Sequence, residues 1–354
     1  MAFFHELARR GIKRFRGALH RGAHATHRDV GSLKKANDSA YAERFREVIS
    51  DPLNLLIERD PRAGYVDESG RVFLHHGLRV PLRGVGSYYE TFFDLLIYNR
   101  GVHEPLEEFC FQTLLGALAE ERGKGREAGR EFGSGPESGR ESGPESGAGS
   151  RRGSGPVRML ELGALWAHYS MWLKSRLPEA QVYMVEPDEV RREAGIRNFA
   201  FNGLEGEFMA GRVGQGLGVD PDAHAIARAN CPEFSVDGFM EREGVDRLTL
   251  VHCDIQGNEL EMLEGARRAL EARTIDFLFV STHGRELHEA CAAELQKFGY
   301  AVEVDSEPDT HATAYDGFLL GTSPEVAPLF DDFRPLGRVE IANAKAEELV
   351  AYLQ

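Results

Sequence analysis

Residues 157–188 read VRMLELGALWAHYSMWLKSRLPEAQVYMVEPD, and this stretch decides the fold. Its first part, 157–162, is a short apolar run of the kind found in a parallel strand buried on both faces. A turn follows, then a predicted helix over 165–177 and a second predicted strand over 181–185. Strand, turn, helix and strand form the repeating unit of an open α/β sheet, which binds ligands outside the carboxyl ends of its strands.

A glycine turn and an acidic residue stand at those carboxyl ends. Glu186 follows the second strand, 23 residues after Gly163. An acid at this distance is placed to accept hydrogen bonds from a ribose diol, so a ligand containing adenosine is expected. A dinucleotide would favour three glycines around its pyrophosphate, whereas residues 163–168 contain one. The single glycine suits S-adenosylmethionine (SAM), which has no phosphate. An ordinary β–α–β unit that binds no ligand is the alternative.

Composition argues against several classes of function. The chain of 354 residues has a formal net charge of −15, which disfavours bulk affinity for nucleic acid. Its four cysteines are scattered, so neither a disulfide framework nor a zinc site is expected, and a reducing, cytoplasmic location fits. No apolar run approaches the roughly 18 residues of a membrane span, and the first residues lack the apolar core of a signal peptide.

Changes in composition divide the chain into segments. Residues 1–30 carry seven Lys or Arg against two acids, and they are interpreted as a basic amphipathic helix on a membrane surface or as a disordered leader. Gly, Ser, Glu, Arg and Pro dominate 122–156, which predicts a disordered insertion. The predicted segments are a basic arm at 1–37, a cap region at 38–121, the insertion at 122–156, a core at 157–322 and a tail with a short helix at 323–354.

Apolar runs and amphipathic stretches alternate along the rest of the core. The predicted strands are at 206–213, 247–254, 275–281, 300–304 and 315–321, with a short extended piece at 234–237. The predicted helices are at 188–201, 258–271, 287–298 and 344–353. This order indicates an α/β fold with a mainly parallel sheet covered by helices on both faces. In the cap region, a hairpin is expected at 71–82 and a helix beginning at Pro105.

Three motifs together resemble one protein family. Residues 252–266 (HCDIQGNELEMLEGA) place an aspartate at the end of a strand and before a helix, 161–164 (ELGA) form a first motif, and 185–188 (VEPD) form a second. These motifs resemble those of the FkbM family of SAM-dependent methyltransferases, over about residues 77–322 without the insertion. Residues 281–283 (STH) and 315–318 (YDGF) are similar to one branch of that family. Gln256 replaces the usual glutamate, and Ala167 stands where a glycine is common.

The resemblance implies a fold, a cofactor and a reaction. It implies the class I methyltransferase (Rossmann-like) fold, whose last strand is antiparallel, here residues 315–321. It also implies SAM as methyl donor and O-methylation of a hydroxyl on a carbohydrate, glycan or related natural product, within the EC 2.1.1 class. The expected partner is therefore a small-molecule or glycan acceptor and not a nucleic acid, with membrane contact through residues 1–30 as an added interpretation.

The expected site residues lie at strand ends and in the cap region. Asp254 and His283 are the candidate catalytic residues, because a base at this edge would remove the proton of the acceptor hydroxyl. The predicted cofactor-binding residues are Glu161, Gly163, Ala164, Glu186, Pro187, Val213, Gly214, Asp254 and Gln256. The predicted acceptor-binding residues are Tyr88, Tyr89, Glu104, His168, Glu259 and His283. His252, Asp254 and Glu259 lack the spacing of a compact ligand set, so no metal is expected.

Two other functions fit parts of the pattern. A nicotinamide-dependent oxidoreductase would use Glu186 equally well, although the single-glycine turn disfavours it. A non-catalytic SAM-fold binding module, attached to a membrane surface by the basic arm, would account for Gln256. A comparison of S-adenosylhomocysteine (SAH) binding with NADH binding distinguishes the methyltransferase from the oxidoreductase. A test for methyl transfer to an acceptor distinguishes it from the non-catalytic module.

Overall fold

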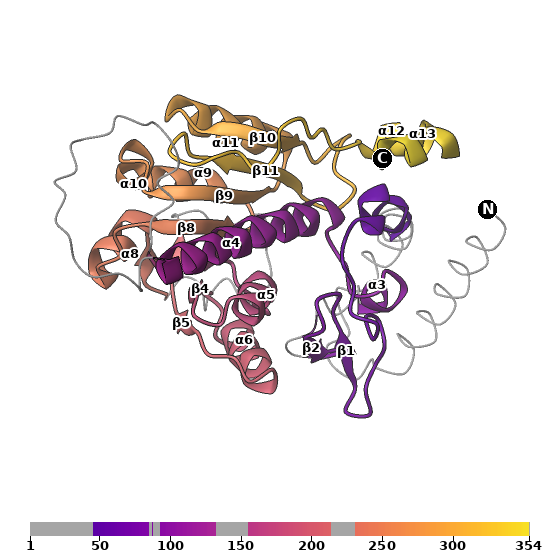
Figure 1. Cartoon of the computed structure of the whole chain (residues 1–354), viewed down its shortest axis with the longest axis horizontal. Coiled ribbons are helices and arrows are strands. Elements are labelled where there is room, and N and C mark those ends of the chain that lie inside the picture. The colour runs from indigo at the N-terminus through magenta and orange to yellow at the C-terminus, as the bar shows by residue number, and fades with distance from the viewer. Residues whose placement is uncertain (1–44, 85–86, 88–92, 132–154, 214–230, 354) are drawn as a thin grey trace, which may run out of the picture.

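A seven-stranded sheet forms the centre of the molecule (Figure 1). The computed structural model describes residues 45–84, 87, 93–131, 155–213 and 231–353. The strand order is β10-β11-β9-β8-β3-β4-β5, and β11 runs antiparallel to both of its neighbours while the other pairs are parallel. The strands are β3 (Arg158–Leu162), β4 (Gln181–Val185), β5 (Glu207–Met209), β8 (Leu248–Cys253), β9 (Ile275–Thr282), β10 (Ala301–Ser306) and β11 (Gly317–Thr322).

This strand order confirms the predicted fold class. The chain runs outward from β3 to β5, returns to β8 on the other side of β3, and ends with an antiparallel strand inserted between β9 and β10. That is the arrangement of the class I methyltransferase fold. In an open α/β sheet, the ligand site lies where the strand order reverses, at the carboxyl ends. Here the reversal falls between β3 and β8.

Helices cover both faces of the sheet. One face packs on α4 and α5, and the other packs on α8 to α11, so two hydrophobic cores form. Successive residues of a strand point to opposite faces, so Leu250 belongs to the first core and Val251 to the second. The helices of the core are α5 (His168–Arg176), α6 (Glu189–Phe201), α8 (Val236–Glu243), α9 (Glu259–Glu264), α10 (Arg267–Glu271) and α11 (Arg285–Lys297).

The cap region packs directly on the core. Its elements are η1 (Pro52–Leu55), β1 (Arg71–Phe73), β2 (Arg79–Pro81), α3 (Phe93–Tyr98) and α4 (Pro105–Glu131). The expected hairpin is present as the antiparallel pair β1–β2, and α4 begins at Pro105 as predicted. The helix continues past residue 121, where the insertion was expected to start. Residues 117–131 contain four Glu, three Arg and three Ala, which are good helix formers, alongside three glycines.

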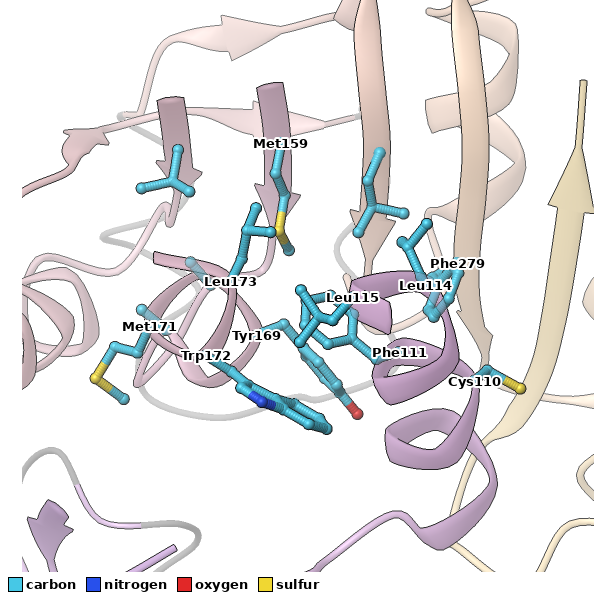
Figure 2. Close-up of a cluster of buried hydrophobic side chains, with 14 of the residues drawn as sticks. Cys110, Phe111, Leu114, Leu115, Met159, Tyr169, Met171, Trp172, Leu173 and Phe279 are labelled. Atoms are coloured by element: carbon cyan, nitrogen blue, oxygen red, sulfur yellow. The ribbon is translucent and has the colours of Figure 1, made fainter. Parts of the chain in front are cut away.

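Side chains of α4 pack against those of α5 beneath the sheet (Figure 2). Phe111 of α4 is fully buried, and its ring lies 5.1 Å from Trp172 of α5 and 6.0 Å from Phe279 of β9. Leu114 and Leu115 extend the same contact. Large buried apolar side chains contribute about 1.5–3 kcal/mol each, so this contact fixes the cap region against the core.

Several elements differ from the sequence-based expectation. The strand expected at 206–213 is divided into β5 and β6 (Arg212–Val213), and β6 pairs with β7 (Glu233–Phe234) in a separate two-stranded sheet. The extended piece ends early because Ser235 accepts the N–H of Gly238 and caps α8. The helix expected at 258–271 is broken into α9 and α10, and the tail contains α12 (Arg338–Asn343) and α13 (Ala346–Tyr352) where one helix was expected.

Some predictions fall on residues outside those that the structure describes. These are the basic arm at 1–37, Tyr88, Tyr89, Gly214 and most of the insertion. Among the helices that are described, none combines the length and the apolar character that crossing a membrane requires.

Candidate functional site

The register of three strands brings two acids and a glycine into one row. Leu162 at the end of β3 pairs with Val185 of β4 on one side and with Cys253 of β8 on the other. The next residue of each strand is therefore Gly163 in the middle, flanked by Glu186 and Asp254. The N–H of Asp254 donates to the carbonyl of Leu162 at 3.0 Å, which ties the β8 end to the turn. Both predicted acids thus stand at the point where the strand order reverses.

The turn after β3 has a left-handed backbone at every second residue. The φ angles are +76° at Gly163, +42° at Leu165 and +60° at Ala167. Only the first is a glycine, and a left-handed conformation costs an L-residue about 1–2 kcal/mol. Strain of this kind persists where surrounding contacts hold it, and it clusters at ligand sites. The turn therefore keeps a left-handed backbone at three positions although only one of them is glycine.

Gly163 is required by a close approach of backbone. A Cβ at this position would overlap the main-chain oxygen of Asp254 and lie 2.8 Å from its carbonyl carbon. The absence of a side chain lets the ends of β3 and β8 approach this closely. The structure thus shows which neighbour requires a glycine at position 163, namely the main chain of Asp254.

Glu186 holds the turn after β3. Its carboxylate accepts the N–H of Leu165 at 3.1 Å and the N–H of Asp188 at 2.9 Å, on different oxygens. The residue is only 4% exposed, and this burial raises the pKa of the carboxyl. Each carboxylate oxygen has a second lone pair, so the group can still accept two hydrogen bonds from a diol. The residues present therefore fit the ribose of a nucleoside ligand.

A second set of polar groups gathers around His283, directly after β9. Its Nε2 lies 3.4 Å from Asp254 and 3.2 Å from Asp316, the residue before β11. Its Nδ1 lies 2.8 Å from Glu259, which is fully buried. The Gln256 side-chain amide completes the set at 2.8 Å from Nε2. We call Asp254, His283 and Asp316, with Glu259 and Gln256, the acidic cluster.

The charges of the acidic cluster shift the pKa values of its members. Burial disfavours the imidazolium of His283, but the hydrogen bond to Glu259 and the charges of Asp316 and Asp254 outweigh it and raise the pKa to about 10. Burial raises the pKa of Asp316 to about 8, against the opposing effect of His283. Burial likewise raises the pKa of Asp254. His283 is therefore a cation near neutral pH, and the aspartates are stronger bases than usual.

An opening lies beside the acidic cluster. About 300 Å³ of space, part of it open to solvent, lies between the start of α4, the end of β10 and the segment before β11. Three of its lining residues are acids, namely Glu104, Glu107 and Asp316. Glu107 is bound to the sheet by His252 at 2.5 Å and by the hydroxyl of Ser281 at 2.9 Å. Glu104 accepts the hydroxyl of Tyr169 at 3.0 Å. One wall of the opening therefore carries three carboxyl groups, two of which already have partners in the protein.

A group of buried imidazoles lies on the other side of the α4 start. We call His75, His76, His103 and His168, with Glu108, the histidine cluster. Glu108 is fully buried, and its carboxylate oxygens lie 2.8 Å from Nε2 of His75 and 2.5 Å from Nδ1 of His103. The side chains come from the β1–β2 turn, the residues before α4, the first turn of α4 and the start of α5. Burial lowers the pKa of His76 and His168 well below the usual range, so both are neutral.

Two sets of residues could hold a metal ion among those that the structure describes. Asp254, His283 and Asp316 form one, and the histidine cluster provides the other, with His75, His76 and His168 or with His103, Glu108 and His168. The imidazole of the first set already has polar partners on both nitrogens. His252, considered from the sequence with Asp254 and Glu259, instead pairs with Glu107.

The structure places the remaining predicted residues as follows. Glu161 is buried and accepts the N–H of Ser170, and Ala164 is buried in the turn. Pro187 follows Glu186, and Val213 lies in β6 with 8% exposure. Glu259 accepts the N–H groups of Ile255 and Gly257 in addition to contacting His283, so it shapes the loop after β8. His168 lies in the histidine cluster and not with Asp254.

Sequence reasoning missed three groups of this site. Asp316 belongs to the Tyr-Asp-Gly-Phe motif, but nothing in the motif's own pattern assigned it a role. Glu107 lies in the predicted helix that begins at Pro105, and no motif assigned it a role. Glu108 and the four histidines come from separate segments, so no spacing identified them. The position of Asp316 directly before the last strand was the one local signal that could have included it among the predicted site residues.

Comparison with known proteins gives one distant relative and several similar folds. No family model matches the chain. A protein of Jannaschia sp. (strain CCS1) described as "Putative methyltransferase" is 26% identical over 220 residues, which cover 51% of this chain and 77% of that protein. The structure of M. capricolum TrmK with SAH is 10% identical, covers 56% of this chain and 76% of that chain, and has a TM-score of 0.33. An O-methyltransferase family protein from Burkholderia thailandensis is 12% identical, covers 47% and 51%, and has a TM-score of 0.30. The fold assignment therefore rests on strand order.

Proposed function

We propose that the chain is a SAM-dependent methyltransferase that transfers a methyl group to a hydroxyl oxygen, and that it belongs to the FkbM-like enzymes whose motifs it resembles. One observation carries the proposal: Glu186 and Asp254 flank Gly163 at the reversal of the strand order. Glu186 would bind the ribose of the cofactor, and Asp254 would act on the acceptor hydroxyl. The methyltransferase-like relative supports the same reaction class.

The residues of the turn would hold the cofactor. Glu186 would accept hydrogen bonds from the ribose hydroxyls, and the backbone at Gly163 and Ala164 would contact the amino-acid part. Bound SAM supplies an activated sulfonium methyl, so the protein's main tasks are alignment of the acceptor and exclusion of water. A pyrophosphate has no cradle of glycines in this turn, which disfavours the oxidoreductase alternative.

The acidic cluster would act on the acceptor hydroxyl. Asp254 is our candidate general base, because burial raises its pKa and its carboxylate stands at the carboxyl edge of the sheet. His283, a cation beside it, would position the carboxylate and balance its charge. The hydroxyl proton would pass to Asp254 as the oxygen–methyl bond forms. A positioned base of this kind contributes about 10²–10⁴-fold to a rate.

The acidic wall of the opening indicates the class of acceptor. Glu104, Glu107 and Asp316 offer carboxyl groups that can hydrogen-bond the hydroxyl groups of an acceptor. A neutral polyhydroxylated acceptor, such as a carbohydrate or a hydroxylated natural product, fits this lining better than a nucleic acid does. The net charge of −15 favours the same choice.

The test separates cofactor binding from transfer. Glu186→Ala is expected to weaken SAH binding in calorimetry, whereas Glu193→Ala, which removes an exposed acid of α6, should bind as the unaltered chain does. Asp254→Asn should retain SAH binding and lose transfer of labelled methyl to a panel of sugars and glycosides. Tighter binding of NADH than of SAH would refute the proposal. SAH binding without transfer to any acceptor would favour the non-catalytic module.

A further inference from the structure

The histidine cluster contains imidazole nitrogens that lack hydrogen bonds. Both ring nitrogens of His76 and of His168 are buried and have no hydrogen-bond partner among the described residues. His168 is 2% exposed, and the nearest acidic atom to its Nε2 is 3.8 Å away, on Glu108. A buried polar group without a partner costs about 1–3 kcal/mol, so unpartnered groups in one place require an explanation.

The nitrogens of His76 and His168 lie close to a ring nitrogen of His75. One ring nitrogen from each of His75, His76 and His168 lies within 4.8 Å of the others, which is a spacing that a single ion can bridge. The ring centres of His76 and His168 are 5.1 Å apart, and those of His75 and His76 are 4.8 Å apart. Imidazole nitrogens are preferred ligands of zinc and neighbouring transition metals. Mg²⁺ and Ca²⁺ prefer oxygen ligands, so a set of three imidazoles does not suit them.

A carboxylate supports one of these imidazoles from behind. Glu108 lies 2.8 Å from Nε2 of His75, while Nδ1 of the same ring lies 3.4 Å from the carbonyl of Glu58. The backbone N–H groups of His103 and Glu104 donate to Glu108 in turn. A histidine that binds a metal usually donates its other ring N–H to a carboxylate, which fixes the ring orientation. Glu108 also provides a buried negative charge that partly balances a divalent cation. The histidine cluster thus provides imidazole nitrogens as metal ligands and a carboxylate beside one of them.

We propose that His75, His76 and His168 form a binding site for a divalent transition metal of the zinc class, with Glu108 as the supporting carboxylate. The site joins the β1–β2 turn of the cap region to the first residue of α5, immediately after the strained turn at 163–167. Its role is structural: the ion fixes the cap region on the core next to the cofactor turn. We choose this set over the acidic cluster because both nitrogens of His76 and of His168 lack hydrogen-bond partners among the described residues, whereas both nitrogens of His283 have polar partners.

Metal uptake by the full chain tests the proposal. The protein is stripped with a chelator, desalted and titrated with Zn²⁺ and with Co²⁺, whose visible absorption reports coordination by nitrogen. We expect one ion per chain by mass spectrometry of the metal content, and a rise in melting temperature on Zn²⁺ addition. His76→Ala and His168→Gln should each lower affinity by more than the roughly 10–100-fold that loss of a supporting partner costs.

Matched variants locate the ion. His311→Asn removes a half-buried histidine that hydrogen-bonds Ser306 outside both clusters, so uptake should not change. Asp316→Asn removes a potential ligand from the acidic cluster and should also leave uptake unchanged. His76 is at a turn, so His76→Ala should fold even if His168→Gln does not. Absence of uptake by the unaltered chain, full uptake by His76→Ala, or loss on Asp316→Asn would overturn the proposal.

Discussion

Substitution of Gly163 by alanine tests the geometry on which the proposed function depends. The new Cβ would overlap the main-chain oxygen of Asp254 and lie 2.8 Å from its carbonyl carbon. Carbon atoms in ordinary contact are about 3.5–4.0 Å apart, so the end of β8 must move by at least about 0.7 Å. That movement disturbs the hydrogen bond from Asp254 N–H to Leu162 and the position of the candidate base.

The expected loss of stability has two parts. A left-handed backbone costs alanine about 1–2 kcal/mol, and disruption of a buried hydrogen bond costs about 1–3 kcal/mol. Gly163→Ala should therefore lower the free energy of unfolding by about 2–5 kcal/mol. Gly70→Ala is the matched control, because Gly70 has a φ of +80° and a Cβ added to it would meet no atom within 4 Å. The control should lose only the first part.

Urea unfolding followed by circular dichroism measures both variants, and calorimetry measures their SAH affinity. We expect Gly163→Ala to lose more stability than Gly70→Ala and to bind SAH weakly, while Gly70→Ala binds it as the unaltered chain does. Equal losses of stability in the two variants would show that β8 does not approach the turn closely. Unchanged SAH affinity in Gly163→Ala would remove the turn from the proposed cofactor site.

Three further predictions concern buried groups. Burial raises the pKa of Asp51 from 3.8 to about 6, so the folded state binds this proton more tightly and the free energy of unfolding falls as pH rises from about 4 to 6. Asp51→Asn should remove up to about 3 kcal/mol of that fall, measured by urea unfolding at several pH values. The same pH dependence in the variant and the unaltered chain would contradict this prediction. Phe111→Ala should cost about 3–5 kcal/mol of unfolding free energy, and a loss below about 1 kcal/mol would mean that α4 does not rely on this contact. Glu107→Gln should lower the pKa of His252, because burial disfavours the imidazolium and Glu107 offsets it; an unchanged imidazole titration by NMR would refute the pairing.

The strands of the core could be predicted because their signals are local. A buried parallel strand is a short apolar run whatever its partners are, and the strand expected at 181–185 coincides with β4. Capping is also local, so Pro105 marked the start of α4. The expectation at 206–213 was wrong in detail, because pairing with β7, and not the apolar pattern, decides where β6 forms.

The two clusters could not be predicted in the same way, because they are assembled by tertiary structure. His75, His103 and His168 come from segments far apart in sequence, and only the packing of α4 on α5 brings them together. The positive φ values of Leu165 and Ala167 could not be predicted either, because tertiary contacts and not the residue type determine them. Sequence reasoning assigns a left-handed backbone to glycine, whereas here the hydrogen bond from Leu165 to Glu186 helps to hold it on another residue type.

The first turn of α4 is tied to the sheet through Glu107 and to the histidine cluster through Glu108, and this limits how the site can open. Glu107 is held by His252 of β8 and Ser281 of β9, and Glu108 is held by His75 and His103. Breaking a buried ion pair by removing one partner costs about 3–5 kcal/mol, since it leaves a charge without compensation. Movement of α4 away from the core would separate several such pairs together. The start of α4 is therefore a fixed wall of the opening, and an acceptor must enter past segments other than this helix.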